Sequence, residues 1–114
     1  MGAGLLTATT MPGETGLVIV LSGQADAAHI EDLVTALYGH LPARAASLVV
    51  DLAGLSFIDS AALHVLIELA RRLRSRGGGL TLRHPRKPVA DLLMMWDAAA
   101  VMAVEPGDSR PALA

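Results

Sequence analysis

The sequence contains no cysteine, which excludes disulfide bonds and any cysteine-based zinc or redox site. Aromatic residues make up only 3% of the 114 residues, whereas hydrophobic residues make up 53%. The core must therefore be built mainly from leucine, valine, alanine, isoleucine and methionine. No apolar run reaches the roughly 18 residues that a membrane-spanning helix requires. We therefore expect a soluble cytoplasmic domain that does not insert into a membrane.

Strong positive charge is also lacking, because the formal net charge is -2 at pH 7. A protein held on nucleic acid by phosphate contacts would be basic, so direct nucleic-acid binding is not expected. The glycine triplet at 77–79 follows a helix pattern and contains no Gly-Lys-Ser/Thr, so it is not a phosphate-binding loop. The four histidines show no metal-ligand spacing. We expect neither a metal nor a cofactor.

Apolar segments of strand and helix type alternate along the chain, which predicts a single α/β domain. Its sheet should be mixed but mostly parallel, with about five strands flanked by helices, because the first two strands are joined by a short turn. We expect the domain to cover residues 1–104 and a flexible tail to follow at 105–114. The expected strands are 5–11, 17–21, 47–52, 80–83 and 101–104, and helices should begin at Asp26, Ser60 and Pro88.

The apolar residues of each segment predict which side chains are buried. The unbroken run from Leu17 to Leu21 predicts a strand covered on both faces. In the helices, positions three and four residues apart should face the core. These positions are Ile30, Leu33, Val34 and Leu37 in the first helix, Leu63, Leu66, Ile67, Ala70 and Leu73 in the second, and Val89, Leu92, Leu93 and Trp96 in the third.

The segment 51–60 is the most informative part of the chain. We expect a buried strand to end there, a short loop to cross the end of the sheet, and a long amphipathic helix to start at Ser60. This places a serine hydroxyl at the positive end of a helix, where a phosphate is stabilised. Two roles are open for Ser60. It could cap the helix by accepting a backbone N–H bond, or it could be phosphorylated.

The same segment resembles the phosphorylation loop of the STAS-domain family, in the form found in anti-sigma factor antagonists. A second, weaker match lies upstream, where Gly23 and Asp26 resemble the family's Gly-Glu-apolar-Asp, with Gln24 in place of the acid. The sequence departs from the family at Ala61 and Ala62, where Ser or Thr and then Gly are usual. The matching residues of the loop are Asp51, Leu52, Leu55, Ser56, Phe57, Ile58, Asp59 and Ser60.

The resemblance implies a non-catalytic regulator that binds an anti-sigma factor with serine kinase activity. Phosphorylation at Ser60 would break that complex, and the ATP would belong to the partner. The methyl group of Ala62, where the family has glycine, would stiffen the site and restrict the approach of the partner. The implied partner-binding residues are Asp26, Asp59, Ser60, Ala61, Ala62 and His64.

Two alternatives remain. The first is a STAS adaptor subunit that works on the cytoplasmic ATPase of a membrane ABC-type transporter. The second, less favoured, is a serine hydrolase that uses Ser60, His64 and Glu68, which are spaced four residues apart on one helix face. The strained Gly-x-Ser-x-Gly turn of such enzymes is missing, since Ile58 and Ala62 occupy the glycine positions. We therefore expect no enzymatic activity.

Overall fold

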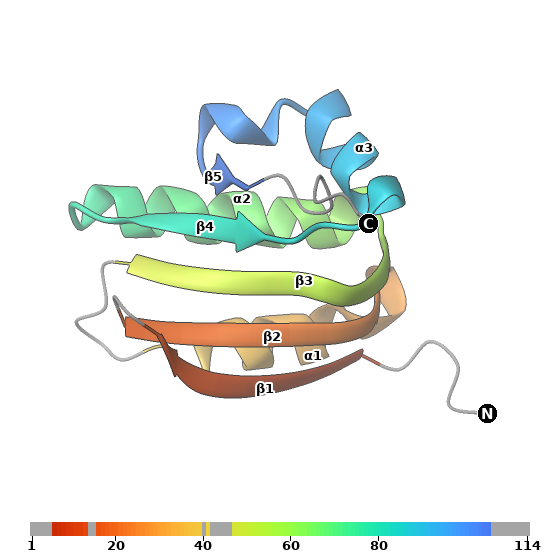
Figure 1. Cartoon of the computed structure of the whole chain (residues 1–114), viewed down its shortest axis with the longest axis horizontal. Helices are drawn as coiled ribbons and strands as arrows, with labels where there is room; N and C mark the ends of the chain where they lie inside the picture. The colour runs from red at the N-terminus through yellow and green to blue at the C-terminus, as the bar shows by residue number, and fades with distance from the viewer. Residues whose placement is uncertain (1–5, 14–15, 40, 42–46, 106–114) are drawn as a thin grey trace, which may run out of the picture.

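A computed structural model describes residues 6–13, 16–39, 41 and 47–105. Five strands form one sheet in the order β1-β2-β3-β4-β5, so neighbours in sequence are also neighbours in the sheet (Figure 1). β1 and β2 are antiparallel, and the remaining pairs are parallel. This confirms the predicted α/β fold with a mixed, mostly parallel sheet. The strands are β1 (Leu6–Gly13), β2 (Gly16–Ala25), β3 (Ser47–Ile58), β4 (Gly79–Arg83) and β5 (Ala103–Val104).

The helices are α1 (Ile30–Tyr38), α2 (Ser60–Ser75) and α3 (Lys87–Met95), with short 3-10 turns η1 (Ala27–His29) and η2 (Ala98–Ala100). Each connects two parallel strands, as βαβ topology requires. α2 ends as predicted at the glycine triplet. Gly77 has a φ of 89°, and the N–H groups of Gly77 and Gly78 donate to the carbonyls of Arg74 and Leu73. This is the Schellman motif that a left-handed glycine makes possible.

The helices α1 and α2 pack behind the sheet in Figure 1, and the core lies between them and one sheet face. In β4, Leu80 and Leu82 are buried, whereas Thr81 between them is only half-buried. β3 begins with the same alternation. The prediction that the run Leu17–Leu21 is covered on both faces holds in part: Val18 and Ile19, which point to opposite faces of β2, are 4% and 0% exposed, but only Ile19 belongs to the core cluster under the helices.

Two predicted core residues, Val34 and Trp96, are exposed. Three others are only partly buried, namely Ile30, Ile67 and Leu92. Ala36 in α1 and Leu69 in α2 take core positions that the sequence analysis did not include. Both helices thus have the predicted type and length, but the buried stripe is rotated slightly from the predicted one.

β3 is much longer than predicted and includes most of the expected loop, running through to Ile58. Its pairing with β2 shifts twice, and at each shift β3 contains one more residue than β2. These bulges explain why buried side chains in this part recur every third residue, at Leu52, Leu55 and Ile58, and not every second. A Cβ at Gly54, beside the first shift, would meet the Ser22 side chain and the Leu21 carbonyl.

A pair of alanine substitutions can test which face of α2 is buried. Leu66 is 1% exposed, whereas the side chain of His64 is 71% exposed. Leu66→Ala should lower the free energy of unfolding by about 2–5 kcal/mol, because it leaves a cavity in the core. His64→Ala should change it by less than about 0.5 kcal/mol. Urea denaturation of both variants measures the difference, and equal losses would mean that the helix faces are assigned wrongly.

Candidate functional site

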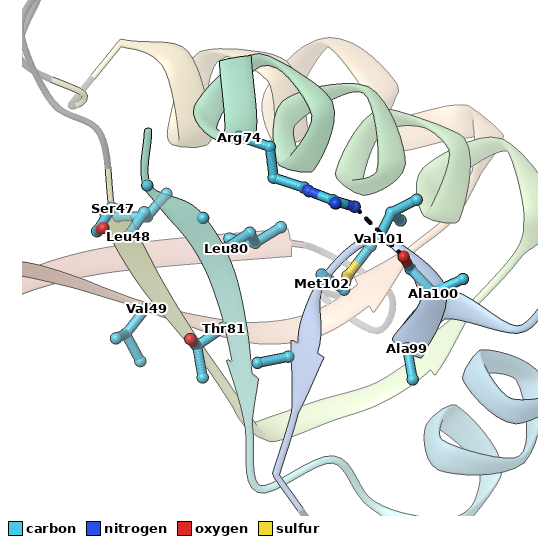
Figure 2. A pocket seen from close by; sticks show the side chains of 13 residues that line it. Ser47, Leu48, Val49, Arg74, Leu80, Thr81, Ala99, Ala100, Val101 and Met102 are labelled. Atoms are coloured by element: carbon cyan, nitrogen blue, oxygen red, sulfur yellow. Dashed lines mark hydrogen bonds between the residues drawn. The ribbon is translucent and has the colours of Figure 1, made fainter. Parts of the chain in front are cut away.

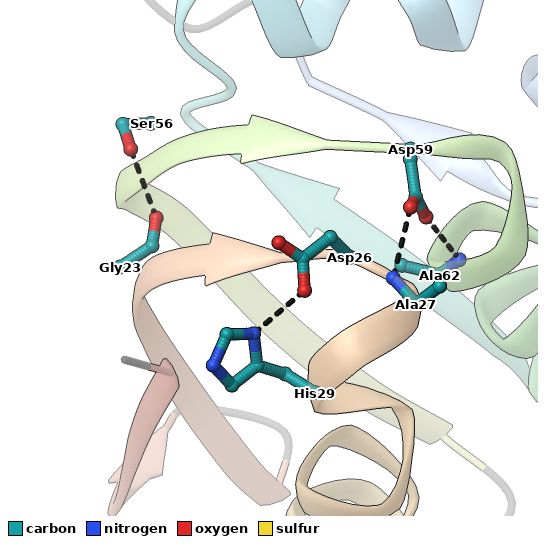
Figure 3. Close-up of polar contacts among 7 residues, drawn as sticks. All are labelled: Gly23, Asp26, Ala27, His29, Ser56, Asp59 and Ala62. Atoms are coloured by element: carbon teal, nitrogen blue, oxygen red, sulfur yellow. Dashed lines mark hydrogen bonds and ion pairs between the residues drawn. The ribbon is translucent and has the colours of Figure 1, made fainter. Parts of the chain in front are cut away.

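The candidate site lies at the end of the sheet where the strands β2 and β3 finish. The two helical segments η1 and α2 begin there. Asp59, the residue between β3 and α2, joins all of these elements (Figure 3). Its backbone N–H donates to the Ala25 carbonyl at 3.0 Å. Its Oδ1 accepts the Ala62 N–H at 3.0 Å, and its Oδ2 accepts the Ala27 N–H at 2.9 Å. One carboxylate therefore caps α2 and the segment that leads into α1.

Ser60 is the first residue of α2 and is exposed. The capping role proposed for it belongs to Asp59, whose extended backbone marks the N-cap position. Within the described part of the chain, the Ser60 hydroxyl has no hydrogen-bond partner. The N–H groups of Ser60 and Ala61 also lack a described partner, as is usual in the first turn of a helix. An exposed hydroxyl thus lies beside unpaired donors at a positive helix end.

Asp26 occupies the N-cap position of η1, but its side chain makes no capping hydrogen bond. Its Oδ1 instead lies 2.6 Å from Nδ1 of His29, and both side chains are mostly buried. Figure 3 shows this pair beside the Asp59 contacts. The side chain of Asp26 therefore contacts the last residue of η1, while the carboxylate of Asp59 accepts the N–H group of its first residue.

The remaining predicted partner-binding residues divide into exposed and buried ones. Ala61 and His64 are exposed and lie on the first turns of α2 with Ser60. Ala62 is 0% exposed, so its inclusion in the partner surface is wrong. Its methyl group packs in the core and leaves the surface shape unchanged. Contrary to the expectation from the sequence, this buried methyl group does not obstruct the approach of a partner.

The geometry of Ser60, His64 and Glu68 gives little support to hydrolysis. Nε2 of His64 lies 4.0 Å from Oε2 of Glu68, and these side chains are 71% and 50% exposed. No hydrogen bond joins Ser60 to His64 in the described structure. A nucleophile of this class needs a base within hydrogen-bond reach and a site that excludes water.

Asp51, the first acid of the motif, has a structural role within the sheet. Its Oδ2 pairs with Nη2 of Arg83 on β4 at 3.2 Å, and its Oδ1 accepts the Ala53 N–H at 2.9 Å. Ser56, four residues before Ser60, donates from its hydroxyl to the Gly23 carbonyl at 3.1 Å. The two motif residues thus fasten β3 to its neighbours on either side, which places Asp59 at the end of a fixed strand.

A hollow of about 560 Å³ lies at the opposite end of β3, where β3 and β4 begin. Figure 2 shows Arg74 reaching from α2 across it toward η2, where the guanidinium donates to the Ala100 carbonyl at 3.3 Å. The other lining residues are mostly small or apolar. Among the described lining residues only Arg74 is charged, and its guanidinium is bonded to the Ala100 carbonyl.

None of the helices in the described part of the chain has the length and hydropathy needed to cross a membrane. No group of three or more acidic or histidine side chains lies close enough together to hold a metal ion in that part of the chain.

The chain is similar in sequence to one family of domains and in structure to several solved proteins. Residues 8–103 match the family model described as "Mlab, STAS domain". A search of curated proteins gave no match. Among solved structures, an anti-sigma factor antagonist from Mycobacterium paratuberculosis is 17% identical, with 92% of this chain and 89% of that chain covered and a TM-score of 0.81.

Three further structures have the same fold. The anti-sigma factor antagonist SpoIIAA is 20% identical in its unphosphorylated form, with 87% and 88% of the two chains covered and a TM-score of 0.66. The Bacillus protein has also been solved in a phosphorylated form, with a TM-score of 0.61. The murine anion transporter Slc26a9 is 16% identical, with 90% of this chain but only 20% of the transporter covered and a TM-score of 0.61.

The capping geometry predicts that alanine substitutions at two neighbouring residues differ strongly in their effect on stability. Asp59→Ala removes two hydrogen bonds to a charged acceptor and should lower the free energy of unfolding by about 2–4 kcal/mol. Ser60→Ala removes an unpaired hydroxyl and should change it by less than about 0.5 kcal/mol. Thermal and urea unfolding of the two variants provide the measurement. A larger loss for Ser60→Ala than for Asp59→Ala would return the capping role to Ser60.

Proposed function

The chain belongs to the family of STAS domains, and we propose that it is an anti-sigma factor antagonist regulated at Ser60. It binds an anti-sigma factor that has serine kinase activity, and this binding releases a sigma factor. The chain itself catalyses no reaction and carries no cofactor. Its contact surface consists of the exposed residues around the start of α2, with Asp59 as the residue that holds them in place.

The observation that carries this proposal is the unpaired state of the Ser60 hydroxyl. Since Asp59 caps α2, the serine can be modified without the loss of a structural hydrogen bond. A kinase partner transfers the γ-phosphoryl group of ATP to Ser60 Oγ. The bond from Oγ to phosphorus forms, the β–γ phosphoanhydride bond breaks, ADP leaves, and the hydroxyl proton passes to the base of the kinase.

The phosphate has a favourable place in the free domain but an unfavourable one in the complex. In the free domain it meets the N–H groups of Ser60 and Ala61 and the positive end of α2. In the complex, a partner surface over Ser60 would have to desolvate a charge of about -2 next to the Asp59 carboxylate. Phosphorylation therefore weakens binding while the fold survives.

A second candidate function is that of an adaptor on the cytoplasmic ATPase of an ABC-type transporter. The observation that favours a role at a transporter, though not at an ATPase in particular, is that the same fold forms one part of a solute-carrier anion transporter. A purified transporter ATPase that binds this chain equally well before and after modification of Ser60 would support the adaptor. An anti-sigma kinase that binds only the unmodified chain would support the antagonist.

Regulation at Ser60 predicts that the affinity for the kinase partner depends strongly on whether this residue carries a phosphate. Ser60→Ala should bind the kinase partner as the wild type does, whereas phosphoserine at position 60 should lower the affinity roughly 30- to 1000-fold, the cost of about 2–4 kcal/mol for an unpaired interfacial charge. Calorimetric titration of both forms against each anti-sigma kinase of the same genome measures this. Circular dichroism confirms equal folding, and equal affinities would contradict the switch.

Ser56 is a matched control for assigning the phosphorylated serine. It is also exposed, but it lies on β3 and its hydroxyl donates to the Gly23 carbonyl. Incubation with the kinase and ATP should add phosphate to the wild type and to Ser56→Ala but not to Ser60→Ala. Mass spectrometry of the peptide that contains both serines locates the phosphate. Incorporation that persists in Ser60→Ala would place the acceptor elsewhere.

A further inference from the structure

Three consecutive large apolar residues are exposed at the end of α3. Met94, Met95 and Trp96 are 78%, 76% and 53% exposed. They make up half of the six large hydrophobic residues that are exposed in the described part of the chain, and they are consecutive. The buried face of α3 consists of Val89 and Leu93, so the residues that follow leave the core as the helix ends at Trp96.

Trp96 forms one wall of a hollow beside the proposed phosphorylation site. The hollow has a volume of about 300 Å³, at the small end of the range for ligand pockets. Leu63 and Ile67 contribute apolar surface, and Ser60 and His64 contribute polar groups. The hollow is lined by Ser60, Ala61, Leu63, His64, Ile67 and Trp96. It therefore combines an apolar interior with the hydroxyl that we propose is modified.

We propose that this hollow receives a large apolar side chain of the anti-sigma kinase, and that Trp96, which lines the hollow, determines the specificity of that partner. The inference rests on the proposed function, because it adds a docking contact to the same surface. Ser60 belongs to the lining, so a kinase that brings ATP to the Ser60 hydroxyl must also cover the hollow. Tryptophan is enriched at the centre of such interfaces.

The position of Ser60 also links the hollow to the switch. A phosphate on Ser60 adds a strongly hydrated dianion to the lining of an apolar hollow. An apolar side chain of the partner could then remain only if the phosphate lost water without gaining a cation. The modification therefore expels the docked side chain, which is a more specific cause of release than repulsion by Asp59 alone.

Trp96 is the only tryptophan of the chain, so it reports directly on the hollow. The chain labelled with 5-fluorotryptophan gives one fluorine resonance. Addition of the purified anti-sigma kinase that phosphorylates Ser60, with ATP left out, should shift or broaden this resonance. The chain phosphorylated at Ser60 should show no such change at the same concentrations.

Calorimetry of two matched variants tests the energetic part. Trp96→Ala should lower the affinity for the kinase roughly 10- to 100-fold, as for other central aromatic contacts. Met11→Ala is the control, because Met11 is 47% exposed but lies on β1, at the sheet edge farthest from β5. It should leave the affinity unchanged. Circular dichroism confirms that both variants fold.

The outcomes separate this proposal from the function on which it rests. If phosphorylation of Ser60 abolishes binding but Trp96→Ala binds as tightly as the wild type and the fluorine resonance stays in place, the hollow is not a docking site and the antagonist function stands. If the resonance moves with the concentration of the chain alone, a second copy fills the hollow and the proposal is wrong. If no anti-sigma kinase binds the wild type, the proposed function falls first.

Discussion

The candidate site depends on the carboxylate of Asp59. One side chain accepts N–H groups from the starts of two helical segments, and its own backbone N–H holds the end of β2. An aspartate is well suited to this position, because both segments present unpaired donors and positive helix ends to the same point. The consequence for function is indirect but strong. Since the cap is already provided, the next residue along the chain can expose its hydroxyl to a partner.

The sheet delivers Asp59 to that point through an irregular strand. A regular β3 would continue the alternation seen in its first half, but two extra residues relative to β2 let buried side chains recur at Leu52, Leu55 and Ile58. The ion pair from Asp51 to Arg83 and the hydrogen bond from Ser56 to Gly23 fasten this part on both sides. Much of the motif therefore fixes where β3 ends, although Ser56 and Phe57 are exposed on the strand as Ser60 is on the helix.

The element order and the strand directions could be predicted because apolar runs and glycine turns set them locally. The end of α2 is an example, where Gly77 adopts the left-handed conformation expected of it. The extent of β3 could not be predicted, because bulges replace the period of two by a spacing that resembles a loop or a helix. Nor could the cap be assigned between Asp59 and Ser60, since either side chain can accept the same N–H group. The helical spacing predicts Trp96 on the buried face, whereas Trp96 is the C-cap of α3 and lines a hollow with residues of α2.

The two departures from the family pattern, Ala61 and Ala62, have different physical meanings once their positions are known. Ala62 is fully buried, so glycine there would remove core contact and add backbone freedom without opening the surface. Ala61 is exposed and lines the hollow beside Ser60, so a serine or threonine there would add a second hydroxyl to its rim. Alanine leaves Ser60 as the only hydroxyl among the lining residues. The substitution at position 61 thus confines the proposed modification to one acceptor and makes the hollow more apolar, which favours the docking of an apolar side chain.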